Sequence, residues 1–400
     1  MDKQVDILII GGGLTGATLM LALQALGYDT VLVETRPFGN QINSDFDARS
    51  LALSPASKRI LNMLGVWAAL EEFITPINHI HVSDKAKFGV ARLQGEVNNP
   101  LGFVIEMQHL NRAIHNQLDQ NQLIAPATLT SLDLAEHYAK LTTNDGELTI
   151  KAQLIVAADG AESVARTWSQ LPAKTRHYEQ QAIVANIGLA KPHQNRAFER
   201  FTPHGPLALL PMQGKRMSLV WAVPPQRARE LTSVSDEQFL KELQNEFGYR
   251  LGRFSKAGKR FTYPLKQVLM PRPIKWPIVF IGNAAHTLHP VAGQGFNLGL
   301  RDVATLAQCI AKHGLKPSML DSYIQLRQHD QYIITQLTDG LINLFTSTIP
   351  GISLMRSIGL VALDNSALLK NTLARYTQGF GGVIPDLVCE IALDNGRVHD

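Results

Sequence analysis

The most informative segment of the chain is Ile281-Gly-Asn-Ala-Ala-His-Thr-Leu-His-Pro-Val-Ala-Gly-Gln-Gly-Phe-Asn-Leu-Gly-Leu-Arg-Asp302. The apolar run from Ile278 to Ile281 predicts a strand, and the glycines and proline after it predict a loop that opens into a helix. Glycine lets a backbone approach a ligand closely, and the first turn of a helix offers free N–H groups to negatively charged oxygens. The segment therefore predicts a loop that binds an anionic group. A glycine-rich turn without a ligand is the alternative.

A second glycine-rich turn lies near the N-terminus, after an apolar run from Val5 to Ile10 that predicts a buried strand. The turn reads Gly11-Gly-Gly-Leu-Thr-Gly16 and satisfies the spacing G-x-G-x-x-G, and helical apolar spacing follows from Ala17 to Leu26. In this motif the first glycine makes the turn, the second lets a pyrophosphate approach, and the third lets the helix pack on the strand. The segment predicts a dinucleotide site.

Two further features extend this interpretation. The apolar run from Thr30 to Val33 predicts a strand that ends at Glu34, where an acidic side chain accepts hydrogen bonds from a ribose. A third segment, Leu154-Ile-Val-Ala-Ala-Asp159-Gly160, is an apolar strand that breaks at Asp-Gly, and taken alone it is an ordinary turn signal. The two glycine-rich turns together suit a flavin dinucleotide, because the pyrimidine ring of a flavin gains negative charge on reduction and would meet the downstream helix start.

The three segments, in this order and at these separations, resemble the flavin-dependent aromatic hydroxylases, which are the group A flavoprotein monooxygenases. Phe46-Asp47-Ala-Arg49 is similar to the Asp-x-Arg element of that family. Within the family the chain looks most like the ubiquinone-biosynthesis hydroxylases. Arg196 to Met212, Ala257 to Arg260 and Tyr263 to Leu265 resemble the 2-octaprenyl-6-methoxyphenol hydroxylase subgroup, and the likeness extends to about residue 380.

The resemblance implies FAD as the cofactor. The residues up to Glu34 would hold its ADP half, and Arg49 and Gln108 would lie along the pyrophosphate and the ribityl chain. The full set of residues that the resemblance assigns to the cofactor is Gly11, Gly13, Thr15, Gly16, Glu34, Arg49, Gln108, Asp159, Gly160, Gly282, Asn283, Pro290, Gly293, Gly295, Phe296 and Asn297.

The resemblance also assigns roles to the later members of this set. Asp159 and Gly160 would contact the dinucleotide and are tied in the family to the nicotinamide donor. Backbone N–H groups near Gly295 would face the flavin carbonyl O2. The chain departs from the usual family pattern at Asn283, where the family has Asp, and at Gln108, where Arg is common.

The pattern along the chain and the resemblance together predict an α/β protein of the para-hydroxybenzoate hydroxylase type. A Rossmann-like FAD-binding domain over residues 1–75, 105–180 and 277–316 is interleaved with a mostly antiparallel β-sheet substrate domain over residues 76–104 and 181–276. Residues 317–400 would form a helical C-terminal region. We also expect a helix from Ile105 to Leu118, and one helix within the sheet domain between Asp236 and Phe247.

The resemblance implies a monooxygenase that hydroxylates the ring of a polyprenylated methoxyphenol in ubiquinone biosynthesis. It would use NAD(P)H as a transient electron donor and react with O2 through a flavin C4a-hydroperoxide. There are two alternatives. The enzyme could hydroxylate a different ring position or an unprenylated phenol, or the protein could be an FAD-bearing scaffold of a biosynthetic complex. The residues that could assist catalysis are His204, Tyr263, His289 and Pro290. For each of them a purely structural role is the alternative. We expect His286 to brace the loop.

The composition fits a large globular enzyme and argues against other classes. The 38 basic and 34 acidic residues give a net charge of +4, and no basic cluster is interleaved with aromatic residues, so we expect no nucleic-acid partner. Cys309 and Cys389 have neither metal-site nor redox-pair spacing, which predicts no metal and fits a reducing cytoplasm. No apolar run reaches the roughly 20 residues of a spanning helix. We expect a cytoplasmic protein, and the apolar tail leaves open a peripheral contact with the inner face of the membrane.

Overall fold

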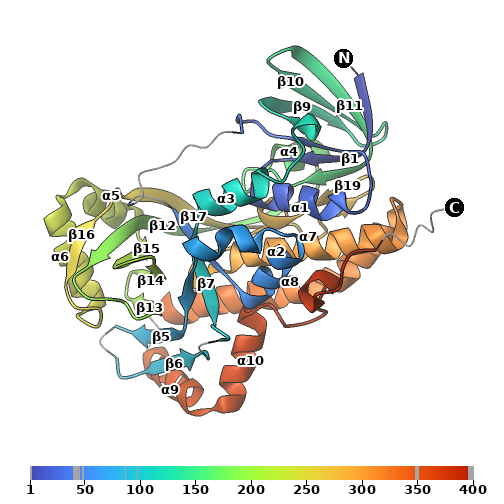
Figure 1. Cartoon of the computed structure of the whole chain (residues 1–400). Helices are drawn as coiled ribbons and strands as arrows, with labels where there is room; N and C mark the ends of the chain where they lie inside the picture. Colours follow the sequence, from blue (N-terminus) through green and yellow to red (C-terminus); the bar gives the residue numbers. More distant parts are fainter. Residues whose placement is uncertain are drawn as a thin grey trace.

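The computed structural model describes residues 2–38, 46, 49–85, 87–96, 98–346 and 351–394 (Figure 1). Asp47 of the predicted Asp-x-Arg element lies outside these residues. Two large sheets form the body, a small sheet lies between them, and helices cover their faces. The predicted α/β architecture, with a helical C-terminal part, is confirmed.

Among the described residues, five strands of the first sheet run parallel, and such a sheet is normally buried on both faces. Ile7 and Ile9 belong to the core on one face and Leu8 and Ile10 to the core on the other, so both faces are covered. The strand order is β18 (Ile274–Lys275), β19 (Ile278–Phe280), β11 (Gly146–Ala157), β1 (Asp2–Ile10), β2 (Thr30–Val33) and β8 (Leu123–Ile124), and the hairpin of β9 (Ala127–Asp133) and β10 (Tyr138–Thr143) extends β11.

The helices of this half follow the strands along the chain. The predicted helix after the N-terminal turn begins at Leu14, and the helix of the downstream segment begins at Gln294. The helices and 3-10 turns are α1 (Leu14–Gln24), α2 (Pro55–Met63), η1 (Trp67–Phe73), α3 (Met107–His115), η2 (Gln120–Gln122), α4 (Val164–Ser169), η3 (Gly282–Ala284), η4 (Val291–Gly293) and α7 (Gln294–His313).

The second sheet is antiparallel, apart from the parallel pair of β13 and β5. Its order is β20 (His286–Thr287), β17 (Phe261–Leu269), β12 (Lys174–Leu189), β15 (Arg216–Val223), β14 (Gly205–Met212), β13 (Arg196–Thr202), β5 (His79–Asp84) and β6 (Val90–Gln94), and β16 (Phe254–Ala257) also pairs with β12. One face is covered by α6 (Asp236–Phe247) and by α5 (Pro225–Ser233), a helix that the sequence did not predict. These helices lie at the outer side of the sheet in Figure 1.

The small sheet corrects one prediction. It consists of β3 (Ser50–Leu53), β7 (Gly102–Glu106) and β4 (Thr75–Ile77), with β7 in the middle. The helix expected from Ile105 is wrong at its start, because Ile105 pairs with Leu51 of β3 and the helix begins only at Met107. Tertiary pairing has overridden a local apolar pattern there.

The C-terminal part is helical, as predicted. It contains α8 (Pro317–Thr346), α9 (Ile352–Asn365) and α10 (Ala367–Thr377), followed by η5 (Asp386–Cys389). Among the described residues, no single helix is both long and apolar enough to cross a membrane. By length and composition, only the pair α9 and α10, bent by 93°, passes such a test.

Candidate active site

The predicted cofactor residues follow four neighbouring strands of the first sheet. Strands β19, β11, β1 and β2 run parallel, and their pairing places their last residues level with one another. The residues at these carboxyl ends are Gly282, Asp159, Gly11 and Glu34. Ligands of open α/β sheets bind in the crevice outside such strand ends, so turns far apart in the sequence meet at one edge.

Two glycines of the N-terminal turn lie in close contact with the backbone, and a third faces open space among the described residues. Gly11 has a φ of +105°, and a Cβ there would lie 2.6 Å from the carbonyl carbon of Ala158. A Cβ at Gly16 would overlap the carbonyl oxygen of Gly11. A Cβ at Gly13 would meet no atom within 4 Å among the described residues. Gly11 and Gly16 therefore serve packing, while Gly13 borders room for a ligand.

Glu34 is held at this turn by the backbone. Its Oε2 accepts a hydrogen bond from the N–H of Gly12 at 2.7 Å, and its Oε1 accepts one from the N–H of Arg36 at 3.0 Å. The carboxylate is thus fixed beside the glycines, at the place where an adenosine ribose meets an acidic residue in dinucleotide sites.

The downstream loop packs directly against the N-terminal helix. A Cβ at Gly282 would lie 2.9 Å from Cγ2 of Thr15, and a Cβ at Gly299 of α7 would lie 3.3 Å from both Gly282 and Thr15. Only glycines allow this approach of α1, η3 and α7. Thr15 therefore joins the two glycine-rich turns by packing.

Asn297 holds the start of α7 through its side chain. Its Nδ2 donates to the carbonyl oxygens of Ala52 at 2.9 Å and Gly293 at 2.8 Å. Its Oδ1 accepts from the N–H of Ser54 at 2.8 Å and from the hydroxyl of Ser57 at 2.7 Å. Because the side chain is fully used inside the protein, Asn297 can meet a ligand only through its backbone. Gly295 and Phe296, in the same first turn, are half-buried.

A buried network of charged residues holds the downstream loop that begins at Gly282. Asp302 accepts hydrogen bonds from the N–H of Gly282 at 3.0 Å, from Nε2 of His286 and from Nε of Arg327 at 2.8 Å. Burial acts to raise the pKa of Asp302, but His286, Arg327 and these hydrogen bonds outweigh it and hold that pKa below its usual range. His286 lies where a residue that braces the loop would lie.

The other predicted cofactor residues have environments that differ from one another. Asp159 accepts from the N–H of Ala165 at 3.0 Å through Oδ2, while its Oδ1 is buried without a partner among the described residues. Gln108 donates to Glu106 at 3.0 Å. Arg49 is exposed, and its Nη1 lies 3.5 Å from the hydroxyl of Tyr263. Asn283 and Pro290 are exposed, and Gly160 and Gly293 are half-buried.

The predicted catalytic residues are not gathered in one cluster. His204 is exposed on the turn between β13 and β14, where its carbonyl oxygen accepts from Gln180 at 2.8 Å. Tyr263 lies on β17 and is 38% exposed. His289 is buried next to Pro290, its Nδ1 accepts from the N–H of Val291 at 3.2 Å, and burial lowers its pKa to about 4.

Sequence reasoning missed Tyr178, a half-buried residue beside His289. The ring of Tyr178 meets the ring of His289 edge-on at 5.1 Å, and its hydroxyl donates to Oδ1 of Asp339 at 2.7 Å. Burial and Asp339 raise the pKa of Tyr178 well above its usual value. It also missed Glu199 on β13, whose pKa burial raises to about 8. The signal in the sequence is a charged residue inside the alternating strand Ala-Phe-Glu-Arg-Phe.

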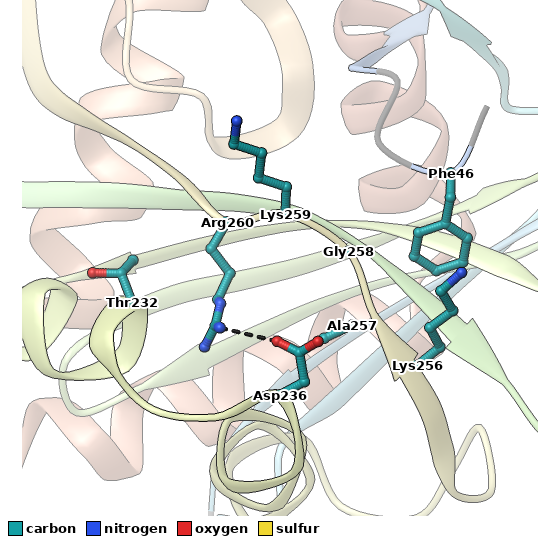
Figure 2. A pocket seen from close by; sticks show the side chains of 8 residues that line it. All are labelled: Phe46, Thr232, Asp236, Lys256, Ala257, Gly258, Lys259 and Arg260. Atoms are coloured by element: carbon teal, nitrogen blue, oxygen red, sulfur yellow. Dashed lines mark hydrogen bonds and ion pairs between the residues drawn. The ribbon is translucent and has the colours of Figure 1, made fainter. Parts of the chain in front are cut away.

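A separate open hollow of about 480 Å³ lies on the sheet domain (Figure 2). Arg260 forms an ion pair with Asp236 across it at 2.9 Å, and Lys256 stacks over the ring of Phe46 at 4.1 Å. None of its lining residues is one of the predicted cofactor residues. The remaining lining residues are Thr232, Ala257, Gly258 and Lys259. With Arg260 paired and Lys256 stacked in this way, we assign no ligand to it.

The residues at the strand ends fit FAD. Among the described residues, Gly13 borders open space that a Cβ would enter, and Asp159 has a buried oxygen without a partner. Glu34 presents a fixed carboxylate. The first turn of α7 supplies N–H groups for a negatively charged ring edge. These residues could therefore hold each end of the dinucleotide.

The class of protein follows from this fold and site together with the match of residues 4–337 to the family described as FAD binding domain. The chain belongs to this family, and it is an FAD-dependent monooxygenase that takes its electrons from NAD(P)H.

The chain is similar in sequence to two ubiquinone-pathway hydroxylases and similar in fold to one solved monooxygenase structure. It is 35% identical to "Ubiquinone hydroxylase UbiL" of Rhodospirillum rubrum over 94% of this chain and 90% of the relative. It is 29% identical to the 3-demethoxyubiquinol 3-hydroxylase of Escherichia coli, over 94% and 99%. The p-nitrophenol 4-monooxygenase PnpA of Pseudomonas putida has the same fold, with a TM-score of 0.77, 16% identity and coverage of 95% and 99%.

Proposed function

We propose that the protein hydroxylates the aromatic ring of a polyprenylated methoxyphenol in ubiquinone biosynthesis, using FAD, NAD(P)H and O2. The names of the two relatives, a ubiquinone hydroxylase and a 3-demethoxyubiquinol 3-hydroxylase, support the pathway. The observation that carries the proposal is an apolar, half-buried face of the second sheet turned toward the loops of the first. That face carries Val184, Ala208, Leu210 and Val220.

The orientation of this face follows from its packing. Its neighbours on β13 are Ala197, which shares a buried cluster with Val104 of β7, and Phe201, which shares one with Val291 of η4 and stacks on Phe345 of α8. β7 belongs to the small sheet beside the start of α7, and η4 belongs to the downstream loop. A substrate ring on this face would therefore lie between the sheet and the predicted flavin loop.

The chemistry supplied by bound, reduced FAD is activation of O2 for insertion of one oxygen atom into an electron-rich ring. The protein's own part is positioning and dryness. The apolar face binds the ring and the start of the prenyl chain and excludes water, which protects the activated oxygen from being lost as hydrogen peroxide. Asn297 and Asp302 hold the loop that presents N–H groups to the cofactor.

The test uses purified holoenzyme, NADH, ¹⁸O2 and 2-methoxy-6-prenylphenol. We expect a product with one ¹⁸O atom in the ring, whose position is then assigned by NMR. Oxidation of NADH that yields only hydrogen peroxide, at every pH and with no ring product, would refute the proposal. Equal turnover of unprenylated 2-methoxyphenol would favour that alternative substrate. If a Gly13→Val variant without FAD restored ubiquinone in a deletion strain, the scaffold function would be favoured instead.

We also propose that α9 and α10 contact the membrane in which a polyprenylated substrate dissolves. Several large apolar side chains on these helices are exposed: Leu354, Met355, Ile358, Val361, Leu368 and Leu369.

Burying one such side chain in the membrane stabilises the bound state by about 1.5–3 kcal/mol. We therefore expect the double variant Met355→Glu and Leu368→Glu to reduce flotation with phosphatidylethanolamine–phosphatidylglycerol vesicles at least tenfold. Ile391→Glu, at an apolar position outside these helices that is 54% exposed, is the control. Equal flotation of all forms would contradict the contact.

A further inference from the structure

Glu199 lies on the substrate-facing side of β13. Side chains along a strand alternate between faces, so Glu199 shares a face with Ala197 and Phe201, its neighbours two residues away. Ala197 belongs to the same buried cluster as Val104 of β7. Phe201 belongs to the same cluster as Val291 of η4, and its ring stacks on that of Phe345 of α8 at 3.4 Å. Glu199 therefore lies on this face between Ala197, on the side of the small sheet, and Phe201, on the side of η4 and α8.

The surroundings of Glu199 on the sheet are apolar. The pairing places it level with Ala208 of β14 on one side and Val82 of β5 on the other. Beyond Ala208 the same row continues through Val220 of β15 to Val184 of β12. This row of five residues crosses the apolar face that we assign to the substrate ring. Glu199 is the one residue of the five whose side chain can ionise.

The carboxyl group of Glu199 has no internal use that the structure displays. Its Oε1 is buried and has no hydrogen-bond partner among the described residues, which is rare for a buried polar atom in a native protein. Burial raises its pKa to about 8. Charged groups on the packed elements are engaged elsewhere: Asp84 of β5 with Arg356 of α9, Asp339 of α8 with Tyr178, and Glu106 of β7 with Arg216 of β15. His289, before η4, faces Tyr178.

We propose that Glu199 binds the phenolic hydroxyl of the substrate and accepts its proton. This inference rests on the proposed function, because it requires a phenol on the apolar face. The phenolic O–H bond breaks, the proton passes to a carboxylate oxygen of Glu199, and the electron pair stays on the phenolate oxygen. The phenolate is a more electron-rich ring and so a better acceptor of the activated oxygen. The proton returns to solvent when the product leaves.

The experiment measures coupling, which is the fraction of oxidised NADH that yields hydroxylated product rather than hydrogen peroxide. Wild-type holoenzyme is compared with Glu199→Gln from pH 6.5 to 10, with 2-methoxy-6-prenylphenol as substrate. The Gln variant keeps the shape and removes the proton acceptor. Glu246→Gln is the matched control, because Glu246 is a carboxylate of α6 on the opposite side of the sheet.

In the wild type, coupling rises with pH as Glu199 ionises, with a midpoint near 8. In Glu199→Gln we expect coupling at pH 8 to fall on the order of a hundredfold, the usual size of a general-base contribution. The midpoint moves to the phenol's own pKa of about 10. FAD content stays at the wild-type level, and Glu246→Gln behaves as the wild type.

Three results would overturn the inference in ways that can be told apart. A Gln variant with the wild-type midpoint and coupling would show that Glu199 accepts no proton, while the proposed function stands. A wild type that makes no product from the phenol at any pH would fail the proposed function itself. Should the Gln variant not fold, Glu199→Asp decides: it keeps the carboxyl group, so loss of its rise in coupling between pH 7 and 9 would contradict the proposal.

Discussion

The N-terminal turn yields a paired prediction from two glycines three residues apart. Gly13 has a φ of −67° and a ψ of −179°, an extended conformation open to any residue, and a Cβ there meets nothing within 4 Å among the described residues. A Cβ at Gly16 would overlap the carbonyl oxygen of Gly11. We therefore expect Gly13→Val to fold and to bind FAD poorly, and Gly16→Val to fail at the level of folding.

The magnitudes follow from what each side chain meets. In Gly13→Val the added methyl groups would occupy the proposed approach of the pyrophosphate, and we expect the loss of at least one charge-assisted backbone hydrogen bond. Such a bond is worth about 1.5–3 kcal/mol, so the dissociation constant for FAD should rise by roughly 10- to 150-fold. Val is a poorer helix N-cap than Gly, but this costs the apoprotein no more than about 1 kcal/mol.

The assay is titration of apoprotein with FAD, followed by flavin fluorescence, together with urea unfolding of the apoprotein. We expect Gly13→Val to unfold within about 1 kcal/mol of the wild type. Gly16→Val should be insoluble or should lose several kcal/mol, as overpacking against backbone does. Wild-type FAD affinity in Gly13→Val would refute the placement of the pyrophosphate. A stable Gly16→Val would refute the tight packing of α1 on β1.

Three further predictions concern the groups that hold the site. Glu34→Gln should weaken FAD binding about tenfold, since it removes a charged acceptor of hydrogen bonds, and calorimetric titration measures this; unchanged affinity would place the ribose elsewhere. Asn297→Ala removes four hydrogen bonds and should cost about 2–4 kcal/mol in urea unfolding, with faster release of FAD; a loss under 1 kcal/mol would contradict its bracing role. Asp302→Asn breaks a buried ion pair with Arg327 and should cost about 3–5 kcal/mol at pH 7. The pKa of Asp302 is depressed in the folded state, so its contribution is complete above about pH 4 and is lost as pH falls below that value. The difference between wild type and variant should therefore shrink at pH 3.5, and a constant difference would count against the ion pair.

The sequence predicted the parts of this molecule in which local chemistry dictates the backbone. Both glycine-rich turns, the strands before them and the helices after them are present. Glu34 follows β2, as expected of a strand ending there. These features are local, because a tight turn or a close approach needs glycine whatever surrounds it.

The parts that sequence reasoning missed depend on tertiary pairing. Ile105 sits in an apolar pattern compatible with a helix, yet β3 and β4 flank β7 and hold it in a strand. The side chain of Asn297 is directed into the protein by Ala52 and Ser54, which are more than two hundred residues away along the chain. From the sequence alone, the charged residue Glu199 would be expected to face solvent. The pairing of β13 with β14 and β5 places it on an apolar face instead.

We infer that the two glycine-rich turns, which pack together through Thr15, hold the two ends of one FAD molecule. A crystal structure of the holoprotein tests it most directly. We predict the adenosine ribose at the carboxylate of Glu34, the pyrophosphate over Gly13, and the pyrimidine edge of the flavin at the backbone N–H groups of Gly295 to Asn297. Electron density for the dinucleotide that leaves either turn without contact would contradict it.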